Sequence, residues 1–305
     1  MKFIDAHKGR FGVAPICRVL SDYYREHGFT IAPSTYYDAK SRPASKRALR
    51  DEDLKIEIAR VHGANYGVYG TRKVWLHLHR EGLEVARCTV ERLMESLGLQ
   101  GIRRGKRCKT TTADPSAQRP QDLVKRRFNP LHPNALWVAD FTYVPTWAGL
   151  VYVAFVIDAY SRRILGWRAA TSMHAQLVLD ALEQAVWVRR RGGVDTFAGL
   201  IHHTDAGSQY TSIAFTERLA EVGVSPSIGT VGDAFDNALA ETVIGLFKTE
   251  LINPNRPWKT VDQVEIATLH YVDWFNNTRL YEENGDIPPV ELEQAYDYRQ
   301  HRPSA

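Results

Sequence analysis

The spacing of apolar residues changes character near residue 130. Up to residue 100, apolar side chains recur every three or four positions, which is the period of an amphipathic helix. From residue 135 onwards, short continuous apolar runs alternate with longer helical patterns, as is typical of a domain that combines strands and helices. The pattern therefore predicts small all-helical modules followed by a sheet-containing domain.

The first hundred residues are predicted to form several short helices. Helical patterns cover residues 15–24 and 34–37, and the polar, basic stretch 42–50 is typical of a linker. Acids at positions 51–53 favour the start of a further helix there, because they complement the positive end of its dipole. Three short helices within residues 51–100 fit a helix-turn-helix DNA-binding module, although small protein-binding modules share this pattern.

The second half is predicted to form a mixed sheet. Three consecutive strands are followed by two helix–strand units and further helices, an order that places helices on both faces of the sheet. In such a sheet the first and fourth strands are plausible neighbours. The expected strands span residues 136–144, 151–158, 162–170, 199–203 and 225–228, and the helices between them span 176–189 and 213–222.

Composition narrows the classes of protein. The chain has no apolar run of about 18 residues and no apolar signal-peptide core at its start, so a cytoplasmic protein without a membrane span is expected. Its three cysteines are widely separated, which argues against a disulfide framework or a paired-cysteine zinc site.

Charge is divided unevenly along the chain. Residues 1–130 carry a net +12 and residues 131–305 a net −8. This asymmetry favours a basic module that binds a polyanion, joined to an acidic module with another task. Residues 101–130 are basic without apolar periodicity, and we interpret them as an extended linker along a phosphate backbone, although a solvated surface would look the same.

Three acids stand out in the second half. Asp140 interrupts an apolar strand, Asp205 ends another, and Glu241 lies near the start of a helix. A buried carboxylate needs a cation or hydrogen-bond donors, and a cluster of three is favourable only around a hard cation such as Mg²⁺, or Mn²⁺ as a substitute. Taken singly, each acid could be a structural cap or turn residue. Lys248 follows Glu241 on nearly the same line of its helix and could contact a phosphate.

The motifs around these acids resemble those of bacterial insertion-sequence transposases of the DDE superfamily, which also contains retroviral integrases. The similarity covers most of the chain, and thirty-five residues separate Asp205 from Glu241, as the family requires. The motifs are WVADFT at residues 137–142, HTDAGSQY at 203–210, DNALAE at 236–241, FK at 247–248, WFNN at 274–277 and PP at 288–289, together with YGTRK at 69–73 and the tract at 103–107.

The resemblance implies a ribonuclease-H-like catalytic fold that binds two Mg²⁺ ions through Asp140, Asp205 and Glu241. It also implies cutting and joining of DNA at element ends, with terminal inverted repeats and target DNA as partners and a homo-oligomer on DNA. The chain would be a downstream-frame product, made alone or fused to an upstream-frame protein. Predicted DNA contacts are Lys248, Arg72, Lys73, Arg87, Arg92, Arg103, Arg104, Lys106 and Arg107.

The resulting domain plan has five parts. An N-terminal helical segment (1–50), a helix-turn-helix-like domain (51–100) and a basic linker (101–130) precede the catalytic core (131–252) and a C-terminal helical extension (253–305). Two alternatives remain open beside a DNA-joining enzyme. One is a metal-dependent nuclease on the same fold, and the other is a DNA-binding regulator whose catalytic domain is silent.

Overall fold

The computed structural model describes residues 1–103, 123–124, 129–205, 207, 209–229 and 238–301. Its chain divides into two compact units, residues 1–56 and 57–305. Arg104, Lys106 and Arg107, three of the predicted DNA contacts, lie outside the described residues.

The first unit is a small helical module. A few apolar side chains form its core, namely Ile4, Ile16, Cys17 and Tyr36. The helix at its N-terminus was not predicted from the sequence, because only Ile4 of that helix is buried and no apolar stripe marks it. Its helices are α1 (Lys2–Phe11), α2 (Val13–Tyr23), a 3₁₀ turn (Arg25–His27) and α3 (Pro33–Ser41).

Helix α4 (Lys46–Ala64) corrects one prediction. Residues 42–50 were interpreted as a linker and the acids at 51–53 as a helix start, but the helix begins five residues earlier than expected. The hydroxyl of Ser45 accepts a 3.1 Å hydrogen bond from the backbone N–H of Ala48, which caps the helix there. The cap, and not the acidic run, sets the N-terminus.

The helices α5 (Thr71–Arg80) and α6 (Arg87–Ser96) follow α4, as the sequence predicted. Their inner faces are apolar at helical spacing, and the fully buried residues on them include Val74, Leu78 and Val90. The segment that connects α4 to α5 contacts the C-terminal part of the chain through buried polar groups. The Trp274 indole donates to the Asn65 side chain at 3.0 Å, and the backbone N–H of Leu280 donates to the Tyr69 hydroxyl at 2.8 Å.

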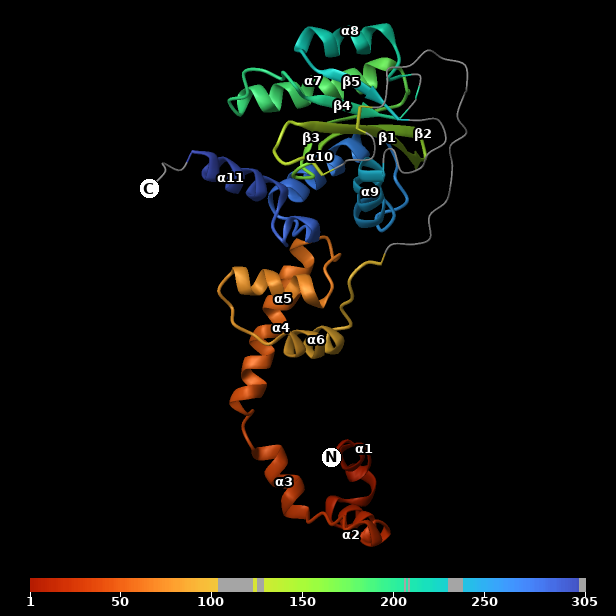
Figure 1. Cartoon of the computed structure of the whole chain (residues 1–305). Helices are drawn as coiled ribbons and strands as arrows, with labels where there is room; N and C mark the ends of the chain where they lie inside the picture. Colours follow the sequence, from red (N-terminus) through yellow and green to blue (C-terminus); the bar gives the residue numbers. More distant parts are fainter. Residues whose placement is uncertain (104–122, 125–128, 206, 208, 230–237, 302–305) are drawn as a thin grey trace. The chain divides into compact units, whose positions relative to one another are not determined.

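The predicted mixed sheet is confirmed. Its strand order is β3-β2-β1-β4-β5 (Figure 1). The pairs β3–β2 and β2–β1 are antiparallel, and the pairs β1–β4 and β4–β5 are parallel. The first and fourth strands are neighbours, as expected. The strands are β1 (Leu136–Thr146), β2 (Gly149–Asp158), β3 (Ile164–Ala170), β4 (Ile201–Thr204) and β5 (Ser225–Ile228).

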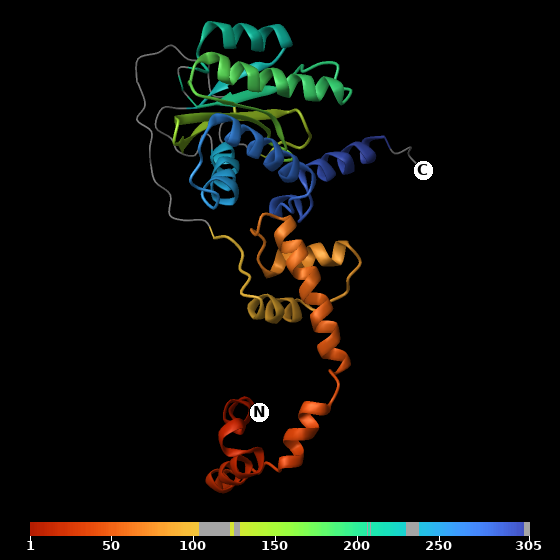
Figure 2. The same ribbon diagram turned by 180° about the vertical axis from the view of Figure 1, so that it is seen from behind.

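Helices cover both faces of the sheet, and Figure 2 shows the same layers from behind. The apolar core on one face lies beneath α7 (Ala175–Arg191) and α8 (Ile213–Val222). Gly166 of β3 allows the close approach of α7, because a Cβ at this position would lie 1.9 Å from the Ala181 carbonyl oxygen.

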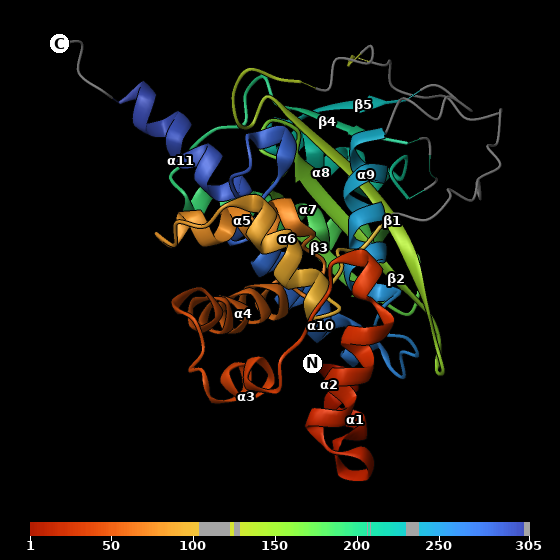
Figure 3. The ribbon, with the colours of Figure 1, turned by 90° about the horizontal axis from the view of Figure 1, so that it is seen from below.

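The opposite face is covered by α9 (Ala238–Phe247) and α10 (Val261–Asn277). Figure 3 shows α9 against β1. Phe247 of α9 contacts Phe155 of β2, with ring centroids 5.0 Å apart. The π-helical turn Lys248–Ile252 continues α9, and α11 (Pro289–Gln300) follows later in the chain. None of the helices within the described ranges is long and apolar enough to span a membrane.

Candidate metal centre and nucleic-acid interface

Asp140 lies in the middle of β1, on the face of the sheet that α9 covers. Neighbouring side chains alternate along the strand, so Ala139 contributes to the core under α7 while Asp140 points the other way. Its cross-strand partner is Phe155, whose ring contacts Phe247 of α9. The backbone N–H of Phe141 donates a 2.7 Å hydrogen bond to the Asp140 carboxylate. The strand therefore presents the acid to α9 rather than to open solvent.

Asp205 lies next to Asp140 because β4 pairs with β1 in parallel. Ala139 is in register with Thr204, so Asp140 and Asp205 are the next residues along the two chains, with Asp205 directly after the end of β4. In a parallel pair, side chains in register point to the same face. The backbone N–H of Gly207 donates to the Asp205 carboxylate at 3.1 Å. Register thus brings together two acids that are far apart in sequence.

The electrostatics of this pair are those of two crowded, poorly compensated charges. Burial raises the pKa of the Asp140 carboxyl well above its usual range, and the nearby charges of Asp205 and Glu241 raise it further. Burial also raises the pKa of Asp205, against the opposing effects of the Gly207 N–H and the His203 side chain. Among the described residues, neither aspartate forms a salt bridge. A cation placed between them would relieve both effects.

Glu241 and Lys248 lie at the two ends of α9. Glu241 occupies the first turn and is exposed, yet it lies close enough to Asp140 for its charge to raise the pKa of that carboxyl. Lys248 begins the π-helical turn that continues the helix. Burial lowers the pKa of the Lys248 ammonium, while the charge of Asp140 acts in the opposite direction. Both predicted residues are thus close enough to Asp140 for their charges to interact with its carboxylate.

The three carboxylates do not yet form a closed set of ligands. Across the described residues, no three His, Cys, Asp or Glu side chains are grouped closely enough to hold a metal ion. The aspartates are adjacent through strand register, whereas Glu241 reaches the site from a separate element. The assignment of these residues as ligands remains a prediction.

The predicted DNA contacts of the helical region have different environments. Arg72 donates to Asp286 at 2.7 Å in a two-pronged ion pair, and the Lys73 ammonium lies 5.5 Å from the Tyr69 ring centre. Burial lowers the pKa of Lys73 to about 8. Contact of Arg72 with DNA would require exchange of its acidic partner for phosphate. Exposed positions are found for Arg87, Arg92 and Arg103.

Tyr210 is a neighbour of the site that sequence reasoning did not single out. It is 2% exposed, and its ring packs against Phe141 and Phe215. After burial, the charges of Asp140 and Asp205 are the main causes that raise its pKa. Within the described residues its hydroxyl has no hydrogen-bond partner. The position of Tyr210 at the end of the HTDAGSQY motif is the only sequence signal that could have drawn attention to it.

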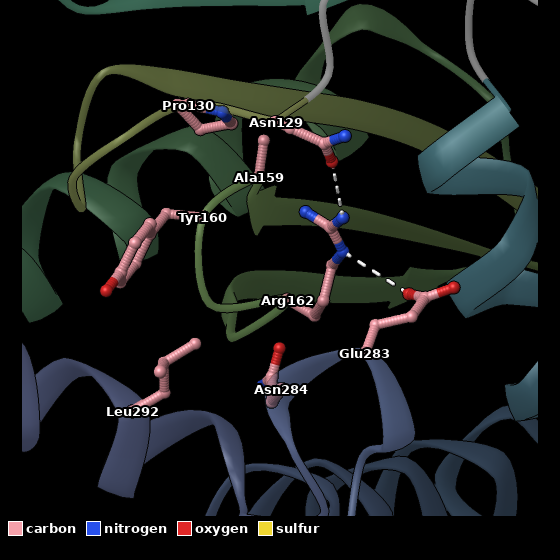
Figure 4. Close-up of a pocket in the computed structure, with 8 residues that line it drawn as sticks. All are labelled: Asn129, Pro130, Ala159, Tyr160, Arg162, Glu283, Asn284 and Leu292. Carbon is pink, nitrogen blue, oxygen red and sulfur yellow. Dashed lines mark hydrogen bonds and ion pairs between the residues drawn. The ribbon is translucent and has the colours of Figure 1, made fainter.

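A separate pocket of about 230 Å³ lies at the opposite end of the sheet, beyond the end of β2 (Figure 4). Arg162 lies within it, donating to Asn129 at 3.2 Å and pairing with Glu283 at 3.7 Å. These two partners leave its guanidinium largely compensated. The pocket therefore does not have the chemistry of the carboxylate end.

Comparison with protein families identifies the class to which this fold and site belong. Models named "Integrase core domain" match residues 130–234 and 222–289, and one named "HTH-like domain" matches residues 48–107. The protein thus combines an integrase-type core with a helix-turn-helix-like module. This agrees with the predicted ribonuclease-H-like sheet preceded by helical modules.

Relatives specify the family more closely. The chain is 64% identical over 275 residues to a "Putative transposase for insertion sequence element IS986/IS6110" of Mycobacterium tuberculosis, covering 90% of this chain and 99% of that one. It is 48% identical over 301 residues to the "Transposase for insertion sequence element IS629" of Shigella sonnei, covering 97% and 96%. The chain belongs to the family of insertion-sequence transposases.

A solved structure also resembles part of the chain. The catalytic core domain of HTLV-2 integrase, determined in complex with magnesium, matches with 18% identity and a TM-score of 0.41. The match covers 53% of this chain and 98% of that one.

Proposed function

We propose that this protein cuts and joins DNA strands at the ends of its insertion sequence, in a reaction that depends on Mg²⁺. The observation that supports the proposal is the parallel register of β1 and β4, which brings together two half-buried aspartates that form no salt bridge within the described residues. Family membership supplies the substrate class, because relatives at this level of identity are named transposases.

The residues present suit a hard divalent cation. Asp140 and Asp205 offer only carboxylate oxygens, and a cation bound between them would oppose the effects that raise the pKa of both. Glu241 would complete the ligand set from α9. When bound there, two Mg²⁺ ions, or Mn²⁺ as a substitute, would supply activation of the attacking oxygen and stabilisation of the leaving oxygen.

The protein's own groups would position the DNA. Lys248 stands beside Asp140 and would neutralise a phosphate of the reacting strand. The backbone N–H groups of Phe141 and Gly207 hold the two carboxylates in fixed orientations, so the ligand oxygens are arranged before DNA arrives. The helix-turn-helix-like module and the basic residues after it would bind element ends, mostly through phosphates. A homo-oligomer on DNA would bring two ends together.

The decisive experiment separates binding from chemistry. Glu241→Gln should bind element-end DNA as tightly as the wild type and cut it at least about a thousandfold more slowly, since metal-mediated charge stabilisation contributes several kcal/mol. Glu217→Gln, a change on the exposed face of α8, is the matched control and should cut normally. Normal cleavage by Glu241→Gln would remove Glu241 from the site.

A second assay distinguishes a DNA-joining enzyme from a nuclease. Pre-cut element ends are supplied with target DNA, and strand-transfer products are measured directly. Joined products that require all three carboxylates support the proposed function. Cleavage without any joining would support the nuclease, and a protein that binds DNA but does neither would be the silent regulator.

A further inference from the structure

Strand β1 continues well past the point where its pairing with β4 ends. The last register pair with β4 is Ala139 with Thr204, whereas pairing with β2 extends to Thr146 and Gly149. One edge of β1 is therefore not paired with β4 from Asp140 outward. A two-residue turn, Trp147–Ala148, closes the hairpin, and the Thr146 hydroxyl donates to the Gly149 carbonyl at 2.7 Å. The hairpin leads directly away from the carboxylates.

The tip of this hairpin is held in place by a distant segment. The backbone N–H of Trp147 donates to the Trp258 carbonyl at 3.0 Å, and that of Ala148 donates to the Lys259 carbonyl at 3.2 Å. Trp258 itself is buried. The Trp147 side chain nevertheless remains 71% exposed, although its backbone is fixed. A large apolar ring on a fixed backbone is a surface prepared for a partner.

Two aromatic side chains along the hairpin each have a lysine ammonium over the ring. The Lys248 Nζ lies 5.1 Å from the ring centre of Tyr143, and the Lys259 Nζ lies 5.5 Å from that of Trp147. Tyr143 is 44% exposed. Within the described part of the chain, neither lysine takes part in a salt bridge. We call these four residues the hairpin stripe. It begins beside Asp140 and ends at the hairpin tip.

We propose that the hairpin stripe binds unpaired nucleotides next to the DNA strand that is being cut, with a base stacked on Trp147 and phosphates beside Lys248 and Lys259. This inference rests on the proposed function, which places the DNA strand at Asp140. Exposed aromatic rings beside positive charges suit single-stranded DNA, because every base has a face that can stack. Bases inside a duplex are already stacked on one another, so only an unpaired base would gain from the Trp147 ring.

Another tryptophan provides a matched control. Trp187 on α7 is 58% exposed, and the Arg191 guanidinium lies 5.2 Å from its ring centre. It therefore shares the exposure and the cation of Trp147. It differs in position, because α7 covers the face of the sheet opposite to Asp140 and α9. A general effect of removing an exposed tryptophan would appear at both positions, whereas a nucleotide site at the hairpin would appear at only one.

The experiment measures binding of the full chain to two fluorescein-labelled duplexes without divalent metal. One duplex is blunt, and the other carries a short run of unpaired thymidines at one end. Trp147→Ala should weaken binding to the overhang duplex about tenfold, as expected for loss of one stacked base, and leave the blunt duplex within about twofold of the wild type. Trp147→Phe should retain most of the affinity, and Trp187→Ala should match the wild type on both.

Lys259→Ala provides an independent measurement. The affinity of this variant for the overhang duplex should fall less steeply with salt concentration than that of the wild type, by the amount expected for loss of about one phosphate contact. Wild-type affinity of Trp147→Ala for the overhang duplex would overturn the proposal, as would equal losses on both duplexes or an equal loss in Trp187→Ala. The outcome is distinguishable from failure of the proposed function, because that failure would appear as normal cleavage by Glu241→Gln, whatever the overhang affinities are.

Discussion

The two ends of the sheet each contain a pair of acids removed from open solvent, yet the surroundings of the two pairs differ. At one end, Asp140 and Asp205 lie side by side, and each accepts a hydrogen bond from a backbone N–H group, that of Phe141 and that of Gly207. At the other end, Asp158 of β2 and Glu293 of α11 both accept hydrogen bonds from Arg189, at 2.9 Å and 2.6 Å. Asp158 and Glu293 are fully buried and ion-paired, whereas Asp140 and Asp205 are half-buried and, within the described residues, form no salt bridge.

The surroundings of Asp158 show what a structural buried acid requires. In addition to Arg189, its carboxylate accepts backbone N–H groups from Asn134, Tyr160 and Ser161. Arg163 provides a further cation for Glu293 at 2.7 Å. The pKa of Glu293 is held below its usual range by Arg189 and Arg163, even though burial alone would raise it. A buried carboxylate therefore indicates a metal site only where protein cations do not compensate it.

The largest expected effect concerns the compensated end. Arg189→Met should lower the free energy of unfolding by about 3–5 kcal/mol, because it leaves Asp158 and Glu293 as buried charges without their shared cation. Urea denaturation provides the measurement. Arg218, which pairs with Glu183 and Glu221 near the surface, is the control, and Arg218→Ala should cost about 1 kcal/mol or less. Equal losses in the two variants would show that Arg189 is no more important than a surface arginine.

The next largest effect is the gain in stability on adding Mg²⁺, which should depend on the Asp140–Asp205 end of the sheet. At a concentration about 100 times the dissociation constant, it should stabilise the wild type by about 2.7 kcal/mol, since only the folded chain brings the carboxylates together. Asp140→Asn should abolish this gain and, without metal, should be no less stable than the wild type, because it removes one of two crowded charges. Thermal unfolding with and without Mg²⁺ tests both points. A full Mg²⁺ effect in Asp140→Asn would place the ion elsewhere.

The smallest effect concerns acid sensitivity. Because the pKa of Glu293 is lower in the folded chain than in the unfolded chain, its contribution to stability is complete above its ordinary pKa and declines as pH falls through the folded value. Glu293→Gln should therefore show a shallower loss of stability on acidification below about pH 4.5 than the wild type. Denaturant titrations across this range measure the slope. Parallel curves for the two proteins would contradict the assignment.

Much of the fold could be predicted because the periodic pattern of apolar residues is a local signal. The predicted strands and the two helices between them correspond to β1 to β5, α7 and α8. The N-terminus of α4 was misplaced because the Ser45 hydroxyl, a single hydrogen-bond acceptor, outweighs a run of acids. Asp286 was not singled out in the sequence, and the structure shows that it pairs with Arg72.

By itself, the sequence determined the strands and helices of the sheet-containing domain, the mixed character of the sheet, and which three acids are candidates for a metal site. Those features depend on local periodicity and on motifs of a few residues. Only the tertiary structure decided that Asp158 forms an ion pair with Arg189 whereas Asp140 forms none within the described residues, and that Lys248 lies over the Tyr143 ring. The reason is physical, because compensation of a buried charge depends on which side chains meet across strands and helices, and those partners are far apart along the chain.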